Sequence, residues 1–181
     1  MHPVVAALAA AALTLTPHQA PQRATKHAAA ARAGATIRLF TLESQLLGQI
    51  NRVRAQRGLR PFRLSSGLTA AANQHSSSMA AKGYFSHSSA NGTSFWKRIA
   101  VFYGYRGYNN WSVGENLLWS SPDVGAPAAV RMWMTSAEHR ANLLNREWRE
   151  IGLAAVHAAN APGVYRGDEV TVVTADFGLR R

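Results

Sequence analysis

The hydrophobic pattern of this chain changes period once, from that of helices to that of strands. Up to Glu150, apolar residues recur at spacings of three and four, as in the series Leu39, Leu42, Leu46, Ile50 and Val53. Such spacing is typical of the buried stripe of an amphipathic helix. Residues 151–156 and 169–177 instead read as two strands. Helices followed by a sheet favour an α+β domain, layered as α-β-α, and exclude a doubly wound fold.

Start and stop signals divide the helical part into four segments. They are expected from Leu39 to Gly58, from Ser65 to Gly83, from Ser94 to Gly104 and from Ala126 to Leu144, with Ser136 as a candidate break in the last one. Pro162, Gly163 and Gly167 lie between the two strands and predict a hairpin through residues 160–168. We therefore expect an antiparallel sheet completed by a C-terminal hairpin.

The first 38 residues differ in composition from the rest. Val4 to Thr16 form an apolar run, which is shorter than the roughly 20 residues that cross a bilayer and matches the centre of a secretory signal. We interpret residues 1–20 as a signal peptide, residues 21–38 as an Ala-, Pro- and base-rich linker, and residues 39–181 as the folded domain. This predicts a secreted, extracytoplasmic protein with no transmembrane helix in its mature domain.

Charge and cysteine content limit the kinds of site. The 181 residues include no cysteine, which excludes disulfides, iron–sulfur sites and thiol nucleophiles and leaves His, Asp and Glu as metal ligands. Lys and Arg number 20 against 9 acidic residues, a net charge of +11. Five of the arginines are Arg52, Arg54, Arg57, Arg60 and Arg63. They could form a patch for an anionic polymer or lipid headgroups, or simply the solvent face of a helix and its exit loop.

Three segments place polar residues in apolar, aromatic-rich surroundings: 84–87, 113–117 and 133–142. His87 follows a helix stop in a loop, where functional residues concentrate. Glu115 could act as a ligand or could tie loops together by accepting backbone hydrogen bonds. His75 shares a helix face with Leu68 and Met79 and is predicted to be a core residue.

These segments belong to an ordered set of short motifs. The set comprises Asn51 with Arg54, Phe85-Ser86-His87, Gly114-Glu115-Asn116, Trp133 with Ser136, His139 and Asn142, Ile151-Gly152-Leu153, and Asp176-Phe177-Gly178. Over residues 39–178 the chain thus resembles a bacterial member of the CAP superfamily of cysteine-rich secretory, antigen 5 and pathogenesis-related proteins, also called SCP-like extracellular proteins. The resemblance implies an α-β-α sandwich with an open cleft, and an inward-facing Arg54.

In that family the cleft holds two histidines and acidic groups, which bind a divalent metal in some members. Carried over, the resemblance implies His87, Glu115 and His139 as metal or catalytic candidates, with Ser136 and Asn116 supporting the cleft. The chain departs from the family at three points. Ser136 stands where eukaryotic members have Glu, His139 lies on a helix and not on a later strand, and Ala175 replaces a frequent Gln.

Three functions follow as expectations. The first is an exported binding or interaction module whose His/Glu cleft takes a divalent metal such as zinc or a lipid-like ligand. The second is a metal-assisted hydrolase using His87, Glu115 and His139, since two imidazoles and a carboxylate can hold zinc and leave a position for water. The third is an electrostatic binder of an anionic cell-envelope polymer or nucleic acid, of which nucleic acid is the less favoured.

Overall fold

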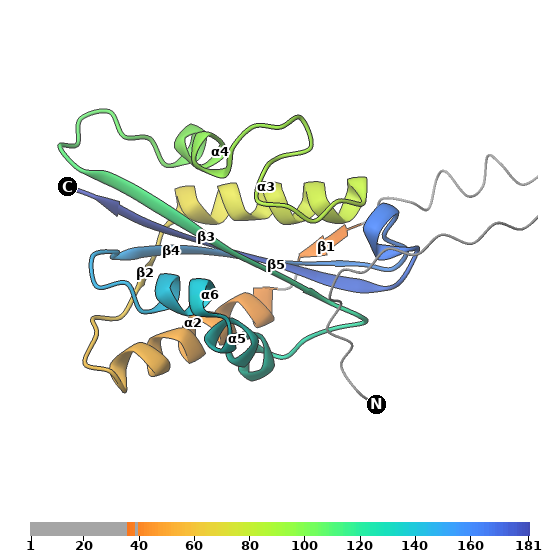
Figure 1. Cartoon of the computed structure of the whole chain (residues 1–181), viewed down its shortest axis with the longest axis horizontal. Helices are drawn as coiled ribbons and strands as arrows, with labels where there is room; N and C mark the ends of the chain where they lie inside the picture. The colour runs from red at the N-terminus through yellow and green to blue at the C-terminus, as the bar shows by residue number, and fades with distance from the viewer. Residues whose placement is uncertain (1–35, 39) are drawn as a thin grey trace, which may run out of the picture.

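A computed structural model describes residues 36–38 and 40–181 (Figure 1). The expected signal peptide and almost all of the expected linker lie outside these residues. The elements are β1 (Thr36–Arg38), α2 (Phe40–Ala55), β2 (Arg63–Leu64), α3 (Ser66–Lys82), α4 (Phe95–Phe102), β3 (Trp111–Ser120), α5 (Ala126–Thr135), α6 (Ala137–Leu143), β4 (Glu150–Ala158), a 3-10 turn (Gly163–Tyr165) and β5 (Val170–Arg180). None of the helices among them combines the length and apolar character that crossing a bilayer requires.

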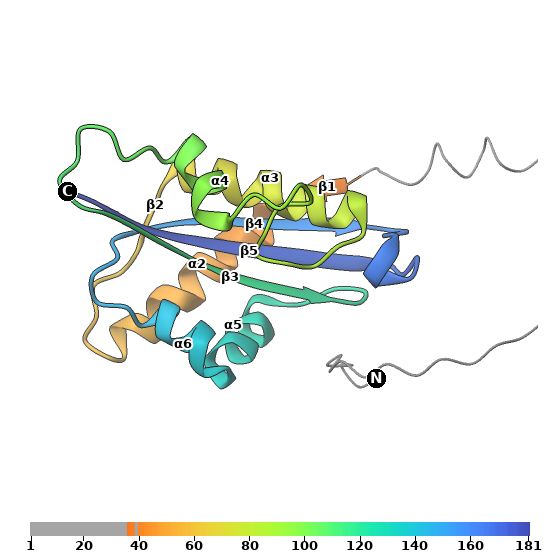
Figure 2. The same cartoon turned by 45° about the horizontal axis from the view of Figure 1, so that its top comes forward.

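One sheet forms the middle layer, with strand order β1-β4-β5-β3. Helices α3 and α4 cover one face, and α2, α5 and α6 cover the other, as Figures 1 and 2 show. The expected α+β sandwich, with β4 and β5 as its C-terminal hairpin, is therefore confirmed. The short strand β2 pairs with β4 in parallel, so the sheet is mixed and not purely antiparallel.

The predicted helices begin and end close to the residues that were expected to cap or terminate them. The Ser65 side chain accepts a hydrogen bond from the Leu68 N–H at the start of α3. Gly83 ends that helix with a left-handed φ of 71°, and its backbone packs so closely on the Pro162–Gly163 peptide that a side chain would not fit. The last helical segment is indeed broken at Ser136, between α5 and α6.

Three strands were not predicted: β1, the two-residue β2, and β3. Residues 114–118 of β3 are buried without a break, because both faces of this strand are covered, so the two-residue alternation that identifies a strand is missing. Strand β1 lies inside the segment expected to be linker, and pairs with β4 from Thr36 to Arg38. These three residues join the sheet by pairing their main chain with β4, so their own sequence needs no strand pattern.

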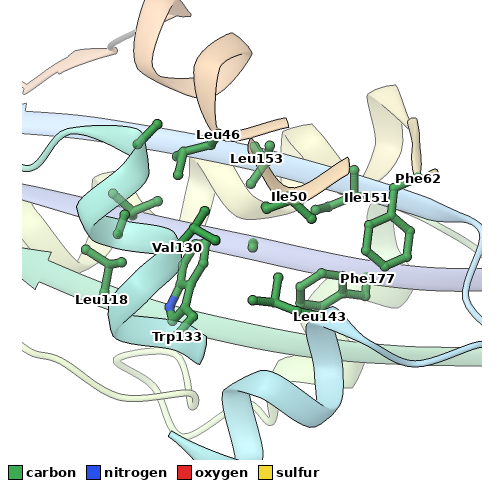
Figure 3. Close-up of a cluster of buried hydrophobic side chains, with 14 of the residues drawn as sticks. Leu46, Ile50, Phe62, Leu118, Val130, Trp133, Leu143, Ile151, Leu153 and Phe177 are labelled. Atoms are coloured by element: carbon green, nitrogen blue, oxygen red, sulfur yellow. The ribbon is translucent and has the colours of Figure 1, made fainter. Parts of the chain in front are cut away.

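The two faces of the sheet are filled differently. Beneath α2, α5 and α6 lies one continuous apolar cluster that includes Leu46, Trp133 and Phe177 (Figure 3). Beneath α3 and α4 there are two smaller clusters, one around Met79 and one around Leu68. Between them runs a belt of buried polar side chains from α3, α4, β3 and β5, consisting of His75, Ser76, Arg98, Glu115, Thr174 and Asp176.

Candidate functional site

The centre of the polar belt is a pair of carboxyl groups on neighbouring strands. Glu115 of β3 lies opposite Asp176 of β5 in the antiparallel register, so both side chains project from the same face of the sheet. Gly152 of β4 is the next residue across, and a side chain there would overlap the Leu68–Thr69 peptide of α3. This glycine lets α3 lie directly on the sheet and bury both carboxyl groups.

Both oxygens of the Glu115 carboxylate have partners. Its Oε1 lies 2.8 Å from Nδ1 of His87, and its Oε2 accepts a hydrogen bond from the Arg98 guanidinium. Arg98 also donates to the His87 carbonyl at 3.0 Å and to Ser89 Oγ at 3.2 Å. One buried guanidinium therefore fixes both the carboxylate and the loop that carries the histidine.

His87 is the accessible member of this network. Its side chain is 54% exposed, whereas that of Glu115 is 1% exposed. The imidazole packs edge-on against Phe95, with 6.3 Å between the ring centroids. Because Nδ1 is engaged by the carboxylate, the other ring nitrogen, Nε2, is the one available to a ligand.

His75 closes the network from α3. Its ring is buried, and Nε2 donates to the Ser86 carbonyl at 2.9 Å, which fixes the tautomer. Burial lowers the pKa of His75 to about 4, although the nearby Glu115 charge acts in the opposite direction. The predicted core histidine is thus a neutral group that also holds the loop leading to His87.

Asp176 is fully buried, and neither of its oxygens has a hydrogen-bond partner among the described residues. Burial raises the pKa of this carboxyl well above its ordinary value, and the Glu115 charge adds to the effect while Arg98 opposes it. The environment therefore favours the protonated, neutral form of Asp176.

Sequence reasoning assigned no role to Arg98. Arg98 does have a signal, since it falls on the inward stripe of α4 together with Phe95 and Ile99, where a charge is out of place. An arginine on such a stripe predicts a buried anionic partner. The partner itself depends on tertiary structure.

His139 lies on the other side of β3. The Asn116 side chain donates to the His139 carbonyl at 3.0 Å, and Asn142 donates to Asn116 Oδ1 at 2.8 Å and to the Glu115 carbonyl at 3.1 Å. Burial and the His87 charge lower the pKa of the half-buried His139. Asn116 thus ties β3 to the helix that carries His139, whereas the half-buried Ser136 makes no side-chain hydrogen bond in the described residues, and the supporting role expected of both residues remains a prediction.

The arrangement does not match a closed metal site. Among the described residues, no three His, Asp or Glu side chains are grouped so that they could hold a metal ion. His87 and Glu115 are in contact, but the Arg98 guanidinium already supplies the positive charge at that carboxylate. The metal-site prediction for His87, Glu115 and His139 therefore remains a prediction.

A groove of about 1030 Å³ runs along the outer side of α3, between that helix, the 89–93 loop and α4. Arg98 and His75 line it, so it adjoins the polar network. One wall carries amide and hydroxyl side chains such as Asn73 and Ser77, and Val101 and Phe102 contribute apolar surface. None of the described residues that line the groove is acidic.

Comparison with protein families and known proteins shows what this chain is similar to. The model of the cysteine-rich secretory protein family, CAP, matches residues 47–177. The Bacillus subtilis protein YkwD is 28% identical over 151 residues, which cover 83% of this chain and 56% of YkwD. The Bacillus subtilis membrane protein YlbC is 32% identical over a segment that covers 62% of this chain and 31% of YlbC. The chain thus spans about half of the first relative and a third of the second.

Two solved structures are similar. An outer surface protein from Borrelia burgdorferi has a TM-score of 0.66 at 20% identity, covering 82% of this chain and 99% of that one, which shows a shared fold. An extracellular protein containing a SCP domain from Bacillus anthracis has a TM-score of 0.58 at 26% identity, covering 76% of this chain and 40% of that one.

Proposed function

Because the chain belongs to the cysteine-rich secretory protein (CAP) family, we propose that it is exported and acts as a binding module whose ligand contacts His87. The observation that carries this proposal is an exposed imidazole anchored on a buried carboxylate. Export is supported by similarity to an extracellular SCP-domain protein and an outer surface protein. Fold membership alone does not fix an activity, so the site supplies the argument.

The network prepares His87 for hydrogen bonding. Glu115 accepts from Nδ1–H, so the neutral ring presents Nε2 as an acceptor, and the protonated ring presents it as a charged donor. Arg98 holds the loop backbone at His87 in place, so little side-chain freedom is lost when a ligand binds.

The groove beside the network can extend the contact. Arg98 is part of the polar network and also lines the groove. The groove wall is polar along α3 and apolar at Val101 and Phe102 of α4. A molecule with a polar head and an apolar body meets complementary surface there. We therefore propose an amphipathic, lipid-like ligand.

The test is a fluorescence titration of the protein with a dansyl-labelled fatty acid. We expect saturable binding that weakens at least about tenfold in His87→Gln, which removes the hydrogen-bonding imidazole at the site centre and corresponds to about 1.4 kcal/mol. The matched control is His157→Gln, a histidine on β4 that pairs with Glu169 at 3.2 Å. Absence of saturable binding, or equal loss in both variants, would contradict the proposal.

The metal-assisted hydrolase is the second candidate. A histidine backed by a buried carboxylate is the base half of many hydrolytic sites, and His87 with Glu115 has that arrangement. Zinc titration calorimetry on the wild type, His87→Ala and His139→Ala tests the metal. Stoichiometric zinc binding that both variants lose, together with hydrolytic turnover, would favour this candidate over the lipid-binding module.

A further inference from the structure

The three long strands, β3, β4 and β5, bring several loops to one end of the molecule. Trp111 pairs with Arg180, and Glu150 pairs with Gly178, so β3 begins, β4 begins and β5 ends on the same side. Figure 1 shows the connections 56–62, 103–110 and 144–149 gathered at this end, which is on the left beside the C-terminus.

Five arginines from two distant segments lie in or beside these connections. We call them the arginine end: Arg57, Arg60, Arg63, Arg146 and Arg149. The Arg63 N–H donates to the Arg149 carbonyl at 3.0 Å, which joins the two segments directly. The sequence alone showed only the first segment, and the structure adds the second.

Buried Arg54 fixes this geometry from below. Its guanidinium donates to the carbonyls of Arg60 at 2.8 Å, Leu143 at 2.7 Å and Asn145 at 3.1 Å, and it stacks on Phe62. The inward-facing role expected for Arg54 is therefore confirmed. Burial lowers its pKa to about 10, and the charge of Arg149 contributes to that lowering, which shows how positive this region is.

The acidic residues at this end are already matched. Glu147 lies 4.0 Å from Arg181, and Glu150 lies 3.9 Å from Arg180. Within the described part of the chain, the side chains of Arg60, Arg63 and Arg146 form no ion pair. The positive charge of the arginine end is thus not neutralised locally.

The opposite end of the sheet has the reverse character. Asp123 lies in the connection after β3, and Asp168 and Glu169 lie in the connection between β4 and β5. A charge excess that served only solubility would need no such separation. The connections at this second end also hold Arg166, so three acidic residues stand there beside one basic residue, whereas the connections at the arginine end hold an excess of arginine.

We propose that the arginine end binds a soluble linear polymer that carries phosphate groups. Guanidinium groups bind phosphate through two parallel hydrogen bonds, and all five positions are arginine and none is lysine. This site is separate from the His87 cleft and does not depend on the function proposed for it.

A lipid surface fits less well. Peripheral membrane binding combines basic residues with apolar side chains that insert. Three of the exposed large apolar residues lie at this end: Leu64, beside Arg63, and Tyr105 and Tyr108 of the 103–110 connection. Both tyrosines carry a polar hydroxyl and are in contact with neighbours, Tyr105 packing edge-on against Trp111 and Tyr108 lying under the Arg180 guanidinium, so Leu64 is the aliphatic side chain among these three. The arginine end therefore offers charge with little to insert.

The experiment measures binding of the full chain to inorganic polyphosphate by fluorescence anisotropy over a series of salt concentrations. The variant is Arg60→Gln/Arg63→Gln/Arg146→Gln. The matched control is Lys82→Gln/Arg131→Gln/Arg166→Gln, which removes the same charge from exposed positions outside the arginine end. Binding of polyglutamate, and of vesicles containing phosphatidylglycerol, is measured beside it.

We expect the variant to bind polyphosphate at least about tenfold more weakly, with a salt slope reduced by about 2, because each phosphate contact to a single strand contributes about 0.7. The control should stay within about threefold of the wild type. Equal losses in variant and control, equal binding of polyglutamate, binding to vesicles alone, or no binding at low salt would each overturn the proposal.

Discussion

The two faces of the central sheet show how one set of strands can carry two different interiors. On the α2, α5 and α6 face, Phe177, Ala175 and Val173 of β5 enter one apolar cluster. On the α3 and α4 face, the alternate residues Asp176 and Thr174 enter the polar belt. Adjacent positions on a single strand therefore serve either packing or the ionisable network.

The two faces differ in the partners that their buried side chains require. An apolar side chain needs only complementary volume, which many residues can provide. A buried charge requires a specific partner, and Glu115 has two, His87 and Arg98, from different segments. We expect the apolar face to respond to substitution independently of pH and the polar belt to respond with a strong pH dependence.

The largest expected effect is that of Arg98→Met. The variant leaves the Glu115 carboxylate buried without its counter-charge, which costs about 4 kcal/mol of unfolding free energy near neutral pH. The measurement is urea unfolding followed by tryptophan fluorescence. The double variant Arg98→Met/Glu115→Gln should recover part of the lost unfolding free energy. A loss below about 1 kcal/mol in Arg98→Met alone would show that the ion pair is not needed for stability.

Leu46→Ala provides the comparison on the apolar face. Leu46 of α2 is fully buried in the main cluster (Figure 3), and removing its side chain should cost about 3 kcal/mol through lost burial and a residual cavity. The same unfolding experiment should give a similar loss at neutral and mildly acidic pH. A loss that changes strongly between these two pH values would remove the proposed distinction between the faces.

Sequence reasoning succeeded where a signal is local. The ends of α3 follow from Ser65 and Gly83, and the break at Ser136 follows from a capping residue. Strand β3 escaped detection because both of its faces are buried. The pairing of Glu115 with Asp176 depends on the register of two strands far apart in the chain, and no local pattern encodes it.

The candidate site was accessible only in part. His87 and Glu115 were chosen through family resemblance, and the structure places them in contact. Arg98 was overlooked although it lies beside Ile99 on the inward stripe of α4, because its partner Glu115 is on a strand that only the fold brings into contact with this helix. The arginine end needed Arg146 and Arg149, which no sequence spacing connects to residues 57–63.

The third prediction concerns acid. The folded-state pKa of His75 is about 4, below its ordinary 6.5, so the unfolded chain binds the proton first as pH falls. Stability from this group is complete above pH 6.5 and declines as pH falls toward 4, by up to about 3 kcal/mol. His75→Gln preserves a donor for the Ser86 carbonyl and removes the titration. Unfolding free energies that fall equally in both proteins across this range would contradict the prediction.

Asp176→Asn should have the smallest effect and the opposite sign. The pKa of Asp176 is raised in the folded protein, so the folded chain retains a proton that the unfolded chain releases. Stability from this group is therefore present in acid and declines as pH rises from about 3.8 toward the folded pKa. Asparagine has nearly the same shape and no charge, so the variant should cost about 1 kcal/mol in acid and progressively less at higher pH.

Urea unfolding at a series of pH values checks this, with Asp168→Asn as the matched control, because Asp168 is exposed in the connection between β4 and β5. The control should follow the wild type throughout. If Asp176→Asn also follows the wild type, the carboxyl is not held neutral by its surroundings. Opposite pH responses of the His75 and Asp176 variants, beside a pH-independent loss in Leu46→Ala, would place two titratable contributions of opposite sign on the α3 and α4 face and separate them from apolar packing on the other face.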